Sequence, residues 1–246
     1  MNNPSSWWEH FFEGVAVDLW LQALPPDHSE READFIARAL TAPPGAELLD
    51  VPCGGGRLSL ALGRRGYKMT GVDWSVEFLK HARATDSAGT VAWERRDMRD
   101  LPWRSRFDGA FCFGNSFGYL DDEGNAAFLR AVAAALKPGA RLVLETPMVL
   151  ENLLGHIQER AWWQVGDMRL LVVNTYDGGT QRLDTEYTFL SDGRCEVKTG
   201  SHRAFTFREL VDLIQGAGFT VETDRPWSRD AATVTFIATR AGTLVD

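Results

Sequence analysis

The segment from Leu48 to Leu62 restricts the fold of this chain more than any other part of its sequence. It reads LLDVPCGGGRLSLAL, in which the pattern of a buried strand leads into three glycines and then into a helical pattern. Glycine permits a tight turn and leaves the backbone bare, so a ligand can approach it closely. In a parallel sheet, the loop after such a strand is where a nucleotide binds. The segment therefore predicts an α/β domain with a nucleotide-like ligand at the glycine loop.

Strand and helix patterns alternate on both sides of this loop. Five segments carry the pattern of a buried strand: residues 46–51, 68–73, 90–97, 107–114 and 141–146. Such alternation with helices is typical of a parallel sheet with right-handed crossovers. Two closing strands are expected near residues 219–224 and 231–239. We therefore predict a Rossmann-like α/β fold with a doubly wound, mostly parallel sheet of seven strands.

The pattern of the sequence changes after Pro147. From residue 162 on, segments appear in which hydrophobic residues alternate with a period of two. The period-two segments are residues 162–176, 181–190 and 194–205. Glycine-containing turn triplets separate these segments, as expected for hairpins. We predict an antiparallel insert of about three strands.

The chain divides accordingly into three parts. Residues 1–44 form an N-terminal helical and aromatic segment, and residues 147–205 form the antiparallel insert. Residues 45–146 and 206–246 together form the ligand-binding domain.

Two capping boxes predict where helices start, one from Ser29 to Glu32 and one from Thr206 to Glu209. The N-terminal segment is also dense in aromatic residues, namely Trp7, Trp8, Phe11, Phe12 and Trp20. These aromatic residues fit either an amphipathic helix packed on the core or a lid that covers a ligand.

Carboxylates end three neighbouring strands of the predicted sheet, at Asp50, Asp73 and Asp97. A carboxylate at Asp50 disfavours a pyrophosphate and suits a cationic group such as a sulfonium or an ammonium. Asp73 can accept hydrogen bonds from both hydroxyls of a ribose, and Asp97 from an exocyclic adenine amine. Together the three acids predict an adenosyl ligand with a cationic tail.

These motifs resemble those of the class I S-adenosylmethionine-dependent methyltransferases. The resemblance is carried by LLDVPCGGGRLSLALGRRGYKMTGVDWS and RRDMRDLPW, and extends in motif order over about residues 45–145. It implies S-adenosylmethionine as the cofactor and methyl transfer to a small molecule as the reaction.

The resemblance assigns the methionine part of the cofactor to the first loop. Asp50, Gly54 and Gly56 match residues that border the methionine in the family. Pro52 stands where the family usually has glycine, and proline removes one N–H and fixes φ. We include Pro52 among the residues expected to contact the cofactor.

The resemblance assigns the nucleoside to the next two strand ends. Asp73 matches the residue that holds the ribose, and Trp74 matches a side chain that often lies against the adenine. Asp97 and the backbone of Met98 match positions that face the same ring.

The loop after the fourth strand, FGNSFGYL, is expected beside the sulfonium, with Phe113 and Asn115 at the cofactor. Methyl transfer is an in-line displacement that depends mainly on alignment of the acceptor, and a hydroxyl acceptor also needs a base. The candidate catalytic residues are Tyr119 in this loop and His202 on the last insert strand, as a base or a substrate contact. The arrangement of loop and insert resembles that of small-molecule N-methyltransferases.

Two other functions are alternatives. A nicotinamide-dependent oxidoreductase would carry G-x-G-x-x-G, but Ser59 occupies the position of the third glycine after Gly54 and Gly56. A protein that only binds S-adenosylmethionine is a third hypothesis, because methyl transfer needs no invariant catalytic residue. The sequence predicts neither the acceptor nor the element that receives the methyl group.

Charge and composition limit the partners of the chain. Its net charge is −8 and it has no Lys/Arg run, which argues against a nucleic acid partner. Its three cysteines form no C-x-x-C motif, so neither a disulfide framework nor a metal site is expected. No apolar run reaches the ~18 residues of a membrane span, and no signal-peptide pattern occurs. We expect a cytoplasmic monomer or homodimer with a small-molecule methyl acceptor.

Overall fold

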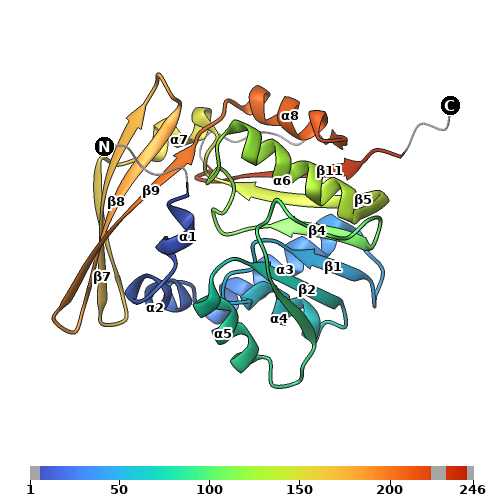
Figure 1. Cartoon of the computed structure of the whole chain (residues 1–246), viewed down its shortest axis with the longest axis horizontal. Helices are drawn as coiled ribbons and strands as arrows, with labels where there is room; N and C mark the ends of the chain where they lie inside the picture. The colour runs from blue at the N-terminus through green and yellow to red at the C-terminus, as the bar shows by residue number, and fades with distance from the viewer. Residues whose placement is uncertain (1–5, 223–230, 243–246) are drawn as a thin grey trace.

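The computed structural model describes residues 6–222 and 231–242, which form two β-sheets (Figure 1). The strand order of the larger sheet is β10-β11-β5-β4-β1-β2-β3. Its strands are β1 (Glu47–Asp50), β2 (Lys68–Asp73), β3 (Val91–Arg95), β4 (Phe107–Cys112), β5 (Leu136–Thr146), β10 (Phe219–Val221) and β11 (Val234–Arg240). Neighbours from β5 to β3 pair in parallel, whereas β11 is antiparallel to both β5 and β10. The predicted Rossmann-like, mostly parallel sheet is confirmed.

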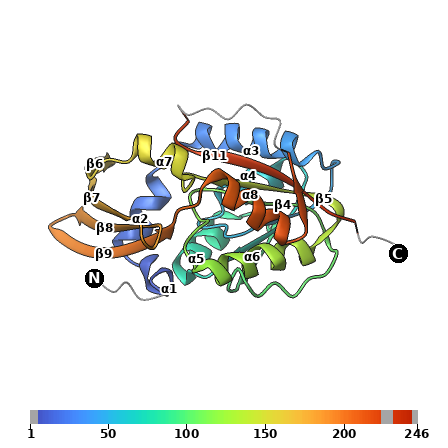
Figure 2. The same cartoon turned by 90° about the horizontal axis from the view of Figure 1, so that it is seen from above.

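Helices cover both faces of this sheet (Figure 2). The helices are α1 (Trp8–Phe11), α2 (Val15–Gln22), α3 (Pro26–Leu40), α4 (Arg57–Arg64), α5 (Val76–Thr85), α6 (Asp122–Ala135), α7 (Leu150–His156) and α8 (Phe207–Gly216). Helices α3 and α4 pack on one face, and α6 and α8 pack on the other. None of the helices in the described ranges is long and apolar enough to cross a membrane.

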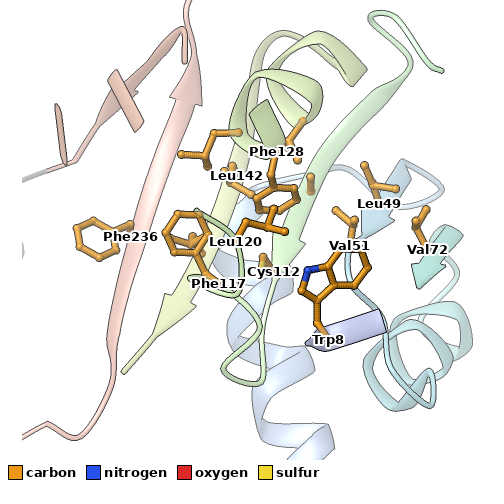
Figure 3. Close-up of a cluster of buried hydrophobic side chains, with 14 of the residues drawn as sticks. Trp8, Leu49, Val51, Val72, Cys112, Phe117, Leu120, Phe128, Leu142 and Phe236 are labelled. Atoms are coloured by element: carbon orange, nitrogen blue, oxygen red, sulfur yellow. The ribbon is translucent and has the colours of Figure 1, made fainter. Parts of the chain in front are cut away.

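The central strand β1 buries side chains on both of its faces. Leu48 packs toward α3 and α4, whereas the next residue, Leu49, packs toward α6. Figure 3 shows Leu49 in one cluster with Leu142, Phe236 and Phe128, the last of which comes from α6. Burial on both faces explains why the strands read as continuous apolar runs in the sequence.

The insert is a separate antiparallel sheet of order β6-β7-β8-β9 in the described part of the chain. Its strands are β6 (Arg160–Val165), β7 (Met168–Asp177), β8 (Arg182–Ser191) and β9 (Arg194–Arg203). The prediction of one strand over residues 162–176 was wrong, because a tight turn with Gly166 at a φ of 57° divides it.

One of the two predicted helix starts is correct. Helix α8 begins with the expected capping box, in which Thr206 Oγ1 accepts from the Glu209 N–H and the Glu209 carboxylate accepts from the Thr206 N–H. The start predicted at Ser29 was wrong, because α3 already begins at Pro26. Proline suits the first helical position, where its missing N–H has no partner to lose.

Replacing Thr206 with alanine should lower the free energy of unfolding by about 1 kcal/mol, since α8 loses a side-chain cap. Urea unfolding followed by circular dichroism measures this change. Ligand affinity should stay at the wild-type value, because neither Thr206 nor α8 lines the cavity described below. An unchanged unfolding midpoint would show that the cap contributes nothing.

Candidate functional site

A cavity of about 580 Å³ lies at the carboxyl ends of β1, β2 and β4. The glycine loop, the loop after β4, the N-terminal segment and the insert all contribute residues to its lining. Helices α1 and α2, which belong to the N-terminal segment, lie between the two sheets (Figure 1). Several candidate residues line the cavity: Asp50, Pro52, Gly54, Asp73, Trp74, Met98, Phe113, Asn115, Tyr119 and His202.

Asp50 is the last residue of β1 and only 2% exposed. Its carboxylate accepts a hydrogen bond of 2.7 Å from Ser59 Oγ, on the first turn of α4. Burial raises the pKa of Asp50 to about 7, and the nearby charge of Asp73 adds to this rise. A cationic ligand would favour the ionised form, so the site is suited to a positive charge. Ser59, which breaks the dinucleotide fingerprint, therefore serves as a partner for Asp50.

Asp73 ends β2 and holds the glycine loop. Its carboxylate accepts from the Gly54 N–H at 2.7 Å and from the Ser75 N–H at 2.8 Å. Burial raises the pKa of Asp73 to about 6, although these two hydrogen bonds favour the carboxylate. Two buried acids thus flank the glycine loop at adjacent strand ends.

Gly54 and Gly56, two of the three glycines of the loop, differ in their surroundings. Gly54 has a φ of 53°, lines the cavity, and has open space where a Cβ would stand. Gly56 does not line the cavity, and a Cβ there would lie 2.3 Å from the Trp93 ring. Its φ of 81° also favours glycine. Gly56 is therefore needed for packing between the loop and β3.

The third acid is placed differently from the first two. Asp97 does not line the cavity, because its carboxylate is engaged by the guanidinium and the N–H of Arg99. Burial opposes this ion pair, but the hydrogen bonds from Arg99 lower the pKa of Asp97. Its neighbours Trp74 and Met98 do line the cavity, and the Arg95 guanidinium lies 4.7 Å from the Trp74 ring centroid.

Tyr119 and His202 meet at the insert side of the cavity, with ring centroids 5.0 Å apart. His202 is 6% exposed, and its Nδ1 has no hydrogen-bond partner. Burial, with a smaller contribution from the positive charge of Arg182, lowers the pKa of His202 to about 3. Burial also raises the pKa of Tyr119. Both side chains are therefore uncharged at neutral pH.

The N-terminal segment is anchored to both sides of the cavity. Trp7 Nε1 donates to the Ser201 carbonyl of β9 at 2.9 Å, and Lys198 Nζ donates to the Phe11 carbonyl at 2.8 Å. On the opposite side, Ser75 Oγ donates to the Phe12 carbonyl at 2.8 Å. Trp7, Trp8 and Phe11 of this segment are buried in the core and also line the cavity, so the two interpretations of the sequence are compatible.

Sequence reasoning missed Trp8 as a specific site residue. Trp8 packs edge-on against Trp74 at 5.7 Å, and its Nε1 is buried without a partner. The aromatic density of the N-terminus was the signal, but it did not distinguish one tryptophan from another. In the described ranges, no group of three or more His, Cys, Asp or Glu side chains is placed to hold a metal ion.

The fold is the one found in solved methyltransferase structures, and the sequence is similar to the same class of domain. Residues 48–139 match a family model described as a methyltransferase domain. Two solved structures share the fold of nearly the whole chain. The CcbJ methyltransferase from Streptomyces caelestis has a TM-score of 0.79 at 19% identity, over 95% of this chain and 99% of that one. The amino pentose methyltransferase CalS10 from Micromonospora echinaspora, with S-adenosylmethionine bound, has a TM-score of 0.68 at 23% identity. The match covers 93% of this chain and 98% of that one.

Sequence similarity extends to a named enzyme over part of its length. The chain is 38% identical over 117 residues to the ubiquinone biosynthesis O-methyltransferase of Xanthomonas campestris pv. campestris (strain B100). The match covers 46% of this chain and 47% of that protein, so the chain spans about half of its relative. The chain is thus similar to methyltransferases in sequence over residues 48–139 and in fold over nearly its whole described length.

Proposed function

We propose that this chain is an S-adenosylmethionine-dependent methyltransferase that methylates a small molecule. The observation that carries the proposal is the pair of buried carboxylates, Asp50 and Asp73, on either side of an open glycine loop. Such a pair suits a ligand with a cationic amino-acid end and a ribose.

The cofactor would lie along the cavity from the glycine loop to the end of β3. Asp50 would pair with its ammonium, and Gly54 and Pro52 would border the methionine part. Asp73 would accept from the ribose hydroxyls, and Trp74 and Met98 would contact the adenine.

Phe113 and Asn115, which follow β4, would lie beside the sulfonium, because β4 pairs with β1 next to Asp50. Gly56 and Asp97 would act indirectly. Gly56 allows the loop to pack on Trp93, and Asp97 fixes the turn before Arg99.

The protein's part in the reaction would be to align the acceptor and exclude water, since S-adenosylmethionine supplies an activated methyl group. Tyr119 and His202 line the part of the cavity where the acceptor would bind. With a pKa of about 3, His202 is a weak base at neutral pH. We therefore assign it a substrate contact in preference to proton abstraction, and we assign the N-terminal segment the role of a lid.

Two further properties belong to the proposal. Cys53, Cys112 and Cys195 are free thiols, which suits a reducing, cytoplasmic compartment. The chain would act as a monomer or homodimer without nucleic acid. The oxidoreductase alternative is disfavoured because the Asp50 carboxylate stands where a pyrophosphate would need positive groups.

A methyl-release screen tests the proposal. The protein is incubated with S-adenosylmethionine carrying a ¹³C methyl group and a panel of uncharged and charged amines, phenols and carboxylic acids. Mass spectrometry follows the labelled product and S-adenosylhomocysteine. We expect stoichiometric transfer to at least one class. Tight binding of S-adenosylhomocysteine without transfer to any acceptor would instead support a protein that only binds the cofactor.

Cofactor affinity should depend on pH, because Asp50 and Asp73 have pKa values of about 7 and about 6. A cationic ligand requires their ionised forms, so binding below pH 7 must release protons. Affinity for S-adenosylhomocysteine should be constant near pH 8 and fall below pH 7, by about tenfold per pH unit for each proton released. Calorimetry in buffers of different ionisation enthalpy counts these protons. An affinity that is flat from pH 5.5 to 8 would contradict the assignment.

A further inference from the structure

One end of the cavity is walled by aromatic rings from three distant parts of the chain. We call it the aromatic compartment and define it by Trp7, Phe11, Tyr119, Tyr187 and His202. Ring centroids lie 4.9 Å apart for Trp7 and Tyr119, 5.2 Å for Trp7 and Phe11, and 5.0 Å for Phe11 and Tyr187. Edge-on packing at these distances is favourable and holds the rings in defined positions. The aromatic rings of the compartment are therefore held in place before any ligand binds.

His202 Nδ1 is the unsatisfied polar atom of this compartment. In the described part of the chain, the buried side-chain nitrogen and oxygen atoms without a hydrogen-bond partner are His202 Nδ1 and Trp8 Nε1, and both residues line the cavity. Ser116 and Thr185 lie beside the hydroxyls of Tyr119 and Tyr187, respectively. Leaving a buried nitrogen unpaired is costly, so its presence in a cavity wall indicates a ligand partner.

The aromatic compartment has no charged side chain to complement an ion. The charged residues that line the cavity belong to the glycine loop, to the strand ends and to the helices around them. Arg182 lies behind His202, but it donates to the carbonyls of Leu120 and Ser201 and does not line the cavity. The positive charge of Arg182 disfavours a cation near His202. An anion would gain little hydrogen bonding from Arg182, because its N–H groups already donate to backbone carbonyls. Burying an unpaired charge here would be costly.

We propose that the methyl acceptor is an uncharged, ring-containing molecule that donates a hydroxyl or N–H hydrogen bond to His202 Nδ1. The histidine tautomer with its proton on Nε2 provides this acceptor atom. The inference rests on the proposed function, because it describes the acceptor of that reaction.

Three probes that differ mainly in charge test the inference: catechol, the anion 3,4-dihydroxybenzoate and the cation dopamine. Each is titrated into protein saturated with S-adenosylhomocysteine, and binding is followed by calorimetry and tryptophan fluorescence. Catechol should bind at least about tenfold more tightly than either ion, because each ion must give up its hydration in an uncharged compartment.

Variants of two histidines separate a specific contact from general packing. His202→Phe should weaken catechol binding by about fivefold to tenfold, the effect of one lost hydrogen bond. The same variant should leave the binding of toluene, which has no hydroxyl, unweakened. The matched control is His156→Phe, because His156 is an exposed residue on α7 outside the cavity. This control should leave all affinities unchanged.

The inference is overturned if either ion binds as tightly as catechol, if catechol does not saturate the site, or if His202→Phe leaves catechol affinity unchanged. In each of these cases, binding of S-adenosylhomocysteine and methyl transfer to another acceptor would leave the proposed function intact. Failure of S-adenosylhomocysteine itself to bind would overturn the proposed function.

Discussion

Replacing Asp50 with asparagine should stabilise the free protein at pH 8 while weakening its binding of S-adenosylmethionine by about 100-fold or more. The pKa of Asp50 rises from its ordinary value of 3.8 to about 7 on folding, so ionisation of this group opposes folding. This cost is absent below pH 3.8, grows as the pH rises towards 7, and then stays constant. A rise of this size corresponds to about 4 kcal/mol at most.

Asparagine keeps the shape of Asp50 and can still accept a hydrogen bond from Ser59, so the apo fold loses little. The bound ligand, however, loses the carboxylate that would pair with its ammonium. Urea unfolding at pH 4.5 and pH 8 and calorimetric titration measure the two effects. We expect the gain in stability at pH 8 to shrink at pH 4.5. Lower stability at pH 8 or unchanged affinity would contradict this account of Asp50.

Asp108→Asn is the matched control, at the opposite end of the same sheet. Asp108 accepts from Lys137 Nζ at 2.6 Å and from the Glu47 N–H at 2.9 Å. Burial opposes its ionisation, but these partners lower the pKa of Asp108. Removing this carboxylate should therefore cost about 1 kcal/mol or less at pH 8, since the pair is partly exposed. Cofactor affinity should not change, because Asp108 lies outside the cavity.

Replacing Gly56 with alanine should destabilise the protein by about 3 kcal/mol or more, the largest stability effect expected in the glycine loop. The new Cβ would lie 2.3 Å from the Trp93 ring and 3.1 Å from the Ala82 Cβ, at a φ of 81°. The ring is held by a hydrogen bond from its Nε1 to Asp86 at 3.2 Å, so it cannot move away without losing that contact.

Gly54→Ala separates backbone strain from steric overlap. Gly54 also has a positive φ, of 53°, but nothing lies within 4 Å of its added Cβ. Its stability loss should be only about 1 kcal/mol, whereas its cofactor affinity should fall, since the methyl group enters the cavity. Adding Trp93→Leu to Gly56→Ala should recover part of the lost stability, as measured by urea unfolding. Equal losses for Gly54→Ala and Gly56→Ala would rule out the overlap with Trp93.

The local sequence predicts well where Asp50 and Asp73 lie in the sheet. Asp50 and Asp73 end parallel strands that pair in register, so their meeting at one edge follows from the strand pattern alone. The strand pattern does not show that an arginine two positions after Asp97 engages its carboxylate. The packing of Trp93 against Gly56 likewise depends on how β3 lies across the loop.

The aromatic compartment is harder to predict from the sequence, because it is assembled from residues far apart in the chain. Trp7 and His202 are 195 positions apart, yet their rings lie 5.2 Å from one another. Their contact depends on how the insert and the N-terminal segment pack together, and no local period encodes that. The sequence could mark both regions as functional candidates, but only the fold brings them into one compartment.

The most direct test of the central claim is calorimetric titration of the wild-type chain with S-adenosylhomocysteine and, separately, with NADH at pH 8. We expect one S-adenosylhomocysteine to bind per chain, with affinity strongly reduced in Asp50→Asn, and no saturable binding of NADH. Saturable binding of NADH without binding of S-adenosylhomocysteine would contradict the claim that this cavity holds a methyl donor.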